Sequence, residues 1–160
     1  MNKSQIDDLE VRIISKLADN ARRPFQDIAR DCCVSGAAVH QRVQKMVACG
    51  AIKGFVTVAD PAMMGYDTCA YVGFILEDPT QFDSMVEHLC SVPEVTECHC
   101  TSGKYDLFVK IYANNNRHLL ELITRMQTLI PCRTETLISF RESFSRPLAP
   151  QLPREPNTGT

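Results

Sequence analysis

The sequence predicts a two-part α+β chain, with an N-terminal helix-turn-helix (winged-helix-like) domain and a C-terminal ferredoxin-like βαββαβ domain. Capped segments of helical period fill residues 7–50, and strand-like and helix-like segments follow in the order βαββαβ from residue 68. Between them, "PAMMGYD" is a turn-rich connection. We expect domains at 1–60 and 68–145, joined by a linker at about 59–67.

Composition indicates a soluble chain of ordinary globular type. Of its 160 residues, 44% are hydrophobic and 22% are charged. The N-terminus has no apolar signal region, and no stretch reaches the ~18 apolar residues that a membrane span needs. We therefore expect a cytoplasmic protein with no membrane partner. Without a secretory signal, the eight cysteines are expected to be reduced thiols.

The first helix begins with an acidic capping box, in which Asp7 is the N-cap and Glu10 lies three residues further on. It ends near Asn20. Pro24 suits the first position of a second, short helix that ends at Cys32 or Cys33. The apolar positions of these two helices are Leu9, Ile13, Ile14 and Leu17, and then Phe25, Ile28 and Ala29.

The third helix runs from an N-cap at Ser35 to a C′ residue at Gly50. Its apolar stripe is Val39, Val43, Met46 and Val47. The opposite face carries small side chains, which let a helix approach a surface closely, and side chains that hydrogen-bond base edges and phosphates. This face consists of Ala37, Ala38, Gln41, Gln44 and Lys45, with Arg42 at its edge.

Charge is unevenly distributed along the chain. The formal net charge is −2, yet residues 22–53 hold six Lys and Arg against Asp27 and Asp31. Such a patch suits a polyanion, although charge alone favours an ordinary solvated helical surface. The helix-turn-helix geometry favours double-stranded DNA as the partner. The predicted DNA-binding residues are Ser35, Ala37, Ala38, Gln41, Arg42, Gln44 and Lys45.

The second half of the chain predicts one antiparallel sheet with two helices. Residues 51–60 first form a strand-like run, and "TCAYVGFIL" is the first strand of the sheet. A helix begins at Asp78 and Pro79, and "VTECHCTS" and "YDLFVKIY" are strands joined by "GK". "TETLISF" is the last strand. The second helix, which Pro131 ends, places Leu119, Leu122, Ile123, Met126 and Leu129 inward.

The first strand predicts a homodimer. Residues 69, 71, 73 and 75 are Cys, Tyr, Gly and Ile, and the intervening positions are Ala, Val, Phe and Leu. Both faces of the strand are therefore apolar, whereas two helices can cover only one face of the sheet. We expect the second face to pack on the same face of another copy.

The chain resembles the Lrp/AsnC family, the feast/famine transcription regulators of bacteria and archaea. The run from Ser35 to Gly50, "IKGF" after it and "ECHCTSGKYDLFVK" carry the resemblance, which covers about residues 6–145. It implies a DNA-reading helix at Ser35–Ala48 and a RAM, or AsnC-type ligand-binding, domain. It also implies dimers that assemble into octamers and bind an amino-acid effector.

The resemblance places effector binding around one loop and the last strand. Glycine lets backbone N–H groups approach a carboxylate, and Asp106 can meet an α-ammonium group. Local sequence alone favours a two-residue hairpin turn at Gly103 and Lys104, with Asp106 capping it. The predicted effector-binding residues are Thr101, Ser102, Gly103, Lys104, Tyr105, Asp106, Thr134 and Thr136.

Three features depart from the family pattern. Cys33 stands where a glycine is usual in the corner, and Pro24 replaces a hydroxylated N-cap. Gly36 and Ala38 stand where prolines or larger residues are frequent, which leaves the target sequence open. A non-glycine residue at positive φ costs about 1 kcal/mol, so we expect strain at the corner. We expect the proline-rich tail 146–160 to be disordered.

Two alternatives remain open from the residues. Cys98 and Cys100 are candidates for a metal- or redox-responsive repressor, although on a strand His99 points to the opposite face. The C-terminal domain could also be a small-molecule-binding module without a DNA role. No nucleophile-base pair or carboxylate dyad is visible, so we predict no enzyme activity, no catalytic residue, no metal site and no cofactor.

Overall fold

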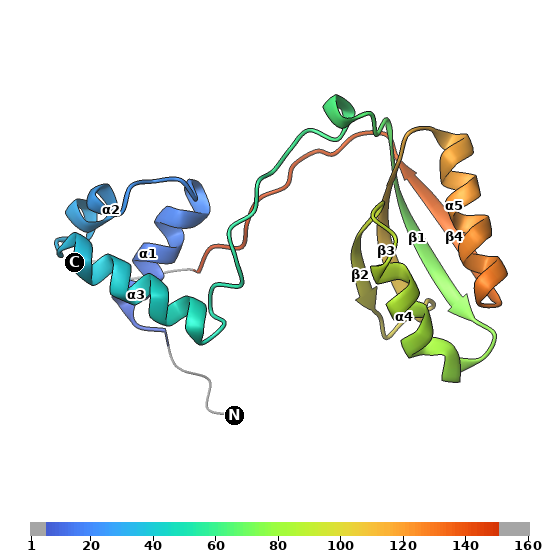
Figure 1. Cartoon of the computed structure of the whole chain (residues 1–160), viewed down its shortest axis with the longest axis horizontal. Helices are drawn as coiled ribbons and strands as arrows, with labels where there is room; N and C mark the ends of the chain where they lie inside the picture. The colour runs from blue at the N-terminus through green and yellow to red at the C-terminus, as the bar shows by residue number, and fades with distance from the viewer. Residues whose placement is uncertain (1–5, 151–160) are drawn as a thin grey trace, which may run out of the picture. The chain divides into compact units, whose positions relative to one another are not determined.

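The structure is a computed structural model that describes residues 6–150. It divides into two compact units (Figure 1). One contains the described residues up to Thr57 together with those from Phe144 onward, and the other contains Val58–Ser143. Each unit has its own hydrophobic core, so each is described separately below.

The first unit is a three-helix helix-turn-helix domain, as the sequence predicts. Its helices are α1 (Asp8–Asp19), α2 (Phe25–Cys32) and α3 (Gly36–Ala48). The Asp7–Glu10 capping box begins α1, and the C-cap is Asn20. All three helices turn apolar residues toward one core, but the prediction that Val47 belongs to the inward stripe of α3 is wrong, since this residue is 46% exposed. The core consists of Ile13, Leu17, Ile28, Ala29, Cys32, Val39, Val43 and Met46.

The corner between α2 and α3 contains the strained residue that the sequence predicts. Cys33 lies in the left-handed region, at φ 57° and ψ 42°, where glycine is the usual residue. This backbone conformation turns the chain back on itself, so that the Val34 N–H donates to the Ala29 carbonyl and closes the corner. The prediction for Pro24 is wrong by one position. Its ψ of 136° is extended, which makes it the N-cap of α2 instead of the first helical residue.

The strand expected at residues 51–60 does not form. This segment is irregular, and Phe55, Val56 and Val58 are 52%, 83% and 92% exposed. Its apolar and polar residues alternate, but a strand also needs a hydrogen-bonding neighbour. No described segment of the chain supplies one, so the periodicity was misleading here.

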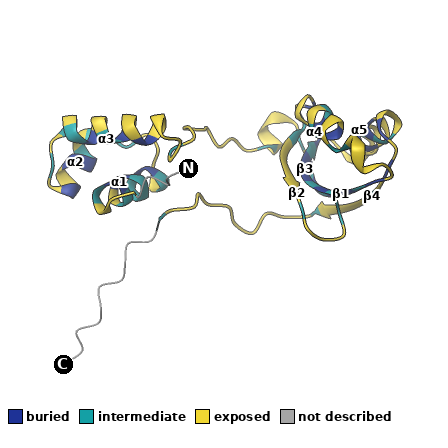
Figure 2. Cartoon of the chain, turned by 90° about the horizontal axis from the view of Figure 1, so that it is seen from below, coloured by how far each residue is buried: buried dark blue, intermediate teal, exposed yellow. Residues whose placement is uncertain are grey.

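The second unit is the predicted βαββαβ domain. Its elements are β1 (Thr68–Leu76), α4 (Phe82–Cys90), β2 (Val95–Cys100), β3 (Leu107–Ala113), α5 (Asn116–Leu129) and β4 (Cys132–Ser139), with short 3₁₀ turns at Ala62–Met64 and Pro79–Gln81. The sheet order is β2-β3-β1-β4, and every pair is antiparallel. Both helices cover the same face of this sheet (Figure 2).

The core of this unit lies between the sheet and its two helices. Val72, Phe74 and Val109 are fully buried there, against Met85 of α4 and Met126 of α5. The prediction that Leu129 points inward is wrong, since its side chain is 59% exposed. The helix ends at Leu129, and the next residue, Ile130, turns into the core instead. Among residues 6–150, no helix combines the length and the apolar character needed to cross a bilayer.

Candidate DNA-binding surface and effector loop

The solvent-facing ridge of α3 is the candidate DNA-reading surface. Ala37, Gln41 and Gln44 are exposed along one side of the helix, and Ala38 is half-buried beside them. Ser35 begins the helix as predicted, because its Oγ accepts the Ala38 N–H at 3.2 Å. This cap stabilises the first turn of α3. The side chains that face outward from the helix are small or carry an amide group. An exposed helix face of this kind suits the major groove of DNA.

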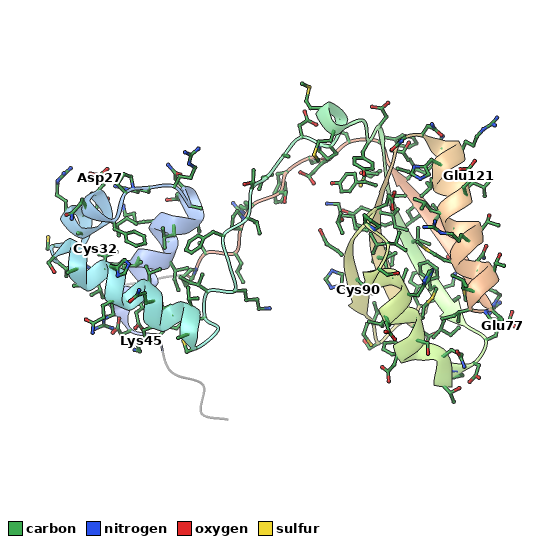
Figure 3. All side chains as sticks on the ribbon, viewed as in Figure 1. Asp27, Cys32, Lys45, Glu77, Cys90 and Glu121 are labelled. Carbon is green, nitrogen blue, oxygen red and sulfur yellow. The ribbon has the colours of Figure 1, made fainter. Side chains whose placement is uncertain are left out.

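Two other predicted DNA-binding residues lie against α1. Arg42 forms an ion pair with Asp7, and its Nη1 lies 3.1 Å from Glu10 Oε1. The Lys45 Nζ lies 2.9 Å from the same Glu10 oxygen (Lys45 is labelled in Figure 3). Glu10 is only 3% exposed, so its carboxylate depends on these two cations for compensation. The sequence predicts only a capping role for Glu10, because this cluster depends on the packing of α3 against α1.

The surroundings of Glu10 set its ionisation. Burial alone would raise its pKa, but hydrogen bonds from Lys45, from the Asp7 backbone and from Arg42 outweigh burial and lower it. The Arg42 side chain is 35% exposed and meets two carboxylates, whereas Lys45 is 59% exposed and meets one. Lys45 therefore keeps donors free for another partner, and Arg42 is mainly a tie between α1 and α3.

Neutralising Glu10 is expected to destabilise the chain in a pH-dependent way. Its folded pKa is below the unfolded value of about 4.3, so its stabilising contribution is present above pH 4.3 and is lost as pH falls through the lowered folded pKa. Glu10→Gln, which keeps a side chain able to complete the capping box, should cost about 2 kcal/mol at pH 7. Urea unfolding followed at pH 7 and at pH 3 measures this cost, and the difference between variant and wild type should shrink at pH 3.

The control for that experiment is Asp27→Asn, which removes an exposed carboxylate paired with Arg30 at 3.3 Å. An exposed pair of this kind contributes little, so the control should unfold like the wild type at both pH values. A Glu10→Gln variant as stable as the wild type at pH 7 would show that the cluster does not stabilise the helix-turn-helix.

The predicted effector loop, Thr101–Asp106, connects β2 to β3. The two-residue hairpin favoured by local sequence is therefore wrong, because six residues separate the strands. Asp106 fixes the end of this loop: its Oδ2 accepts the Leu76 N–H at 2.8 Å, and its own N–H donates to the Phe74 carbonyl at 2.9 Å. This carboxylate joins the loop to β1. Effector binding by Asp106 stays a prediction.

The middle of the loop contacts β4 through Glu135, which is not among the residues predicted from the sequence. Tyr105 Oη donates to Glu135 Oε2 at 2.8 Å, and Lys104 forms an ion pair with Glu135 Oε1. Hydrogen bonds from Lys104 and Tyr105 lower the pKa of Glu135, and the same contacts raise the pKa values of both partners. Glu135 is the only acidic residue of β4, and this is the feature of the sequence that could have indicated its role.

The structure does not gather all of the predicted effector residues. Ser102, Gly103 and Lys104 are exposed on the loop, and Thr101 is half-buried behind them. The β1–β4 register pairs Thr134 with Phe74 and Thr136 with Val72, two residues of the helix-covered face. Thr134 and Thr136 therefore belong to the opposite face from Glu135, and Thr134 instead accepts from Gln127 of α5 at 3.2 Å.

The uncovered face of the sheet is aromatic. Tyr71 of β1 and Phe108 of β3 stack with ring centroids 5.8 Å apart, and Tyr105 stacks on Phe108 at 5.7 Å. Beside them, the Lys110 Nζ lies 6.0 Å from the Tyr71 ring and 5.4 Å from that of Tyr112. The side chain of Lys110 is only 13% exposed. The effector loop and the uncovered face are thus continuous through Tyr105.

The cysteine alternative gains no support from the described residues. Cys98 and Cys100 pair with Val109 and Leu107, which face the helices, whereas His99 pairs with Phe108 of the open face. The predicted divergence of the three side chains is confirmed. Residues 6–150 contain no group of three or more potential ligands that could hold a metal ion. Burial raises the pKa of the Cys98 thiol, which disfavours the reactive thiolate.

Comparison with known proteins agrees with this architecture. Residues 6–47 match the AsnC-type helix-turn-helix domain, and residues 69–148 match the Lrp/AsnC ligand binding domain. The regulatory protein AsnC of Haemophilus influenzae is 33% identical over 147 residues, which cover 91% of this chain and 98% of that protein.

Two solved structures are similar over most of the chain. The structure of E. coli AsnC has 34% sequence identity and a TM-score of 0.83, and the match covers 91% of this chain and 99% of that one. A feast or famine regulatory protein from M. tuberculosis, complexed with L-methionine, has a TM-score of 0.84 at 24% identity, with coverage of 91% and 100%.

A helix-turn-helix joined to a ligand-binding βαββαβ domain defines a DNA-binding transcription regulator. The chain belongs to the Lrp/AsnC family. Its relatives are transcription regulators, as the resemblance in the sequence predicts.

Proposed function

We propose that this chain binds a specific duplex sequence as a dimer and that an amino acid changes this binding. The observation that carries the proposal is the exposed ridge of α3, where Ala37, Gln41 and Gln44 face solvent without an intramolecular hydrogen-bond partner among the described residues. Glutamine pairs with adenine in a major groove, and alanine contacts thymine methyl groups. These side chains read bases, and Ser35 supports the helix that presents them.

Lys45 contacts the phosphate backbone beside this ridge. Its ammonium group has three donors, and the structure uses one of them on Glu10. Phosphate contacts fix the register of a protein on DNA but do not read sequence. Arg42 holds the helix against α1 through Asp7 and Glu10, and its contact with DNA stays a prediction.

The effector is an α-amino acid bound at the loop Thr101–Asp106. The family's C-terminal domain is a ligand-binding domain, and the M. tuberculosis relative was solved with L-methionine. In this chain the ammonium group of Lys104 and the phenol of Tyr105, both from the loop, meet the carboxylate of Glu135 from β4. These groups match the charges of an amino acid.

Dimerisation covers the aromatic sheet face. Tyr71, Phe108 and Tyr105 form a contiguous stack on the face that the two helices leave open. The same patch on a second copy gives a self-complementary contact, with the Lys110 ammonium held between the layers by Glu97 and Glu142, each at 3.6 Å. Octamers, which the resemblance implies, would need further contacts and stay a prediction.

Thermal denaturation of the full chain with each of the twenty amino acids tests the effector. A ligand that binds only the folded state raises Tm, and at a hundredfold excess over Kd it contributes about 2.7 kcal/mol. We expect one amino acid, or a small group of similar ones, to raise Tm by several degrees. No shift with any amino acid at millimolar concentration would exclude an amino-acid effector.

A further inference from the structure

Glu135 has two partners from one loop. Its Oε1 pairs with the Lys104 ammonium group, and its Oε2 accepts the Tyr105 hydroxyl at 2.8 Å. The carboxylate is 49% exposed, so this contact is accessible from solvent. The sequence predicts no ligand-binding role for this residue. Its neighbours Thr134 and Thr136, which the sequence does assign to the effector, belong to the other face of β4.

The position of Tyr105 depends on Gly73. The β1–β4 register places Gly73 opposite Glu135, and the Tyr105 ring lies directly above Gly73 on its way to that carboxylate. A Cβ at residue 73 would overlap the ring. The ring is also stacked on Phe108, with an interplanar angle of 25°. Packing on Gly73 and Phe108 therefore fixes the Tyr105 ring in the position from which its hydroxyl contacts Glu135.

The Lys104–Glu135 pair has the same two charged groups as a free amino acid. An α-amino acid carries one ammonium and one carboxylate a few ångströms apart. An exchange of partners, in which the ligand ammonium meets Glu135 and the ligand carboxylate meets Lys104, leaves no charge unpaired. The exchange requires little energy, because an exposed ion pair contributes little to stability.

We propose that Glu135 binds the α-ammonium group of the effector and that Lys104 occupies this place until the effector arrives. The inference rests on the proposed function, since it assumes an amino-acid effector at this loop. Lys104 then contacts the ligand carboxylate, assisted by the backbone N–H groups around Gly103, where no atom would contact an added side chain.

This exchange also gives the effector a route to the open sheet face. When the ligand ammonium replaces Lys104 at Oε1, it shares the Glu135 carboxylate with the Tyr105 hydroxyl at Oε2, and the Tyr105 ring packs on Gly73 and Phe108. Phe108 stacks in turn on Tyr71 at the centre of the face that a second copy covers. Tyr105 thus connects the carboxylate that binds the effector to the face that a second copy covers.

The test is isothermal titration of the full chain with the amino acid that raises Tm most in the thermal screen, and with its N-acetyl derivative. The N-acetyl compound keeps the carboxylate and side chain but has no ammonium group. For the amino acid, Glu135→Gln should weaken binding at least tenfold. For the N-acetyl derivative, which binds the wild type more weakly, the wild type and the variant should not differ.

The control is Glu121→Gln, which neutralises an exposed carboxylate on α5, away from the loop (labelled in Figure 3). It should bind both ligands like the wild type. Wild-type affinity of Glu135→Gln for the amino acid overturns this inference alone. An equal loss for both ligands overturns it as well, because it would mean that Glu135 only supports the loop. If no amino acid binds the folded wild type, the proposed function fails and this inference fails with it.

Discussion

Phe108→Glu is expected to convert the dimer into monomers and to weaken binding to a specific duplex at least a hundredfold. Phe108 lies at the centre of the open sheet face, between Tyr71 and Tyr105. In the proposed dimer a carboxylate there would be buried without a partner, and an unpaired buried charge costs several kcal/mol. A monomer then binds one half-site at a time and loses the gain from linked binding.

Sedimentation velocity and a binding titration measure the two effects. The duplex is obtained by selection from a random pool with the wild-type chain, so no operator has to be known beforehand. Leu120→Glu is the matched control, because Leu120 is 64% exposed on α5, a helix on the other face of the sheet. It should remain dimeric. A dimeric Phe108→Glu variant that binds the selected duplex normally would exclude this face as the subunit contact.

Replacing Gln41 and Gln44 by alanine together should remove sequence discrimination without unfolding the chain. Each well-placed amide contact to a base is worth about 1–3 kcal/mol, so two contacts account for a preference of at least about thirtyfold. Both side chains are exposed and take no part in the core of the first unit. The expected variant binds the selected duplex about as weakly as a random duplex of equal length, and its binding to the random duplex is unchanged.

Two further variants, Arg42→Ala and Lys45→Gln, are compared with the wild type on the same two duplexes. Lys45→Gln should weaken binding to both duplexes and reduce the slope of log affinity against log salt by about one for each subunit bound. Both variants should lower the stability of the chain, because each removes one of the two cations that compensate the buried Glu10 carboxylate, but only Lys45→Gln should change the salt slope. Undiminished discrimination in the double glutamine variant would mean that another surface reads the sequence.

The sequence predicted those parts of the fold that depend on local signals. The Asp7–Glu10 box and the Ser35 cap fix where α1 and α3 begin, and both are observed. The strained corner at Cys33 followed from a single unusual residue. The failures came where a pattern needed a partner: residues 51–60 have strand periodicity but no neighbouring strand, and Leu129 has helical spacing but lies where α5 ends.

The side-chain arrangement of the candidate sites was less predictable, since it depends on contacts between distant segments. Arg42 and Lys45 have the spacing of DNA-contacting residues, but only the packing of α1 on α3 reveals that both reach Glu10. The contacts of Glu135 follow from the β1–β4 register, which places it beside Gly73 and near Tyr105. Periodicity assigns a residue to a face, but it does not show which residues meet across that face.

Hydroxyl-radical footprinting on the selected duplex tests most directly the claim that paired copies present two α3 helices to one DNA site. The account predicts two protected segments related by two-fold symmetry, with centres separated by about one helical turn or a multiple of it. A single protected segment at saturating protein, with one chain bound to each duplex, would contradict it.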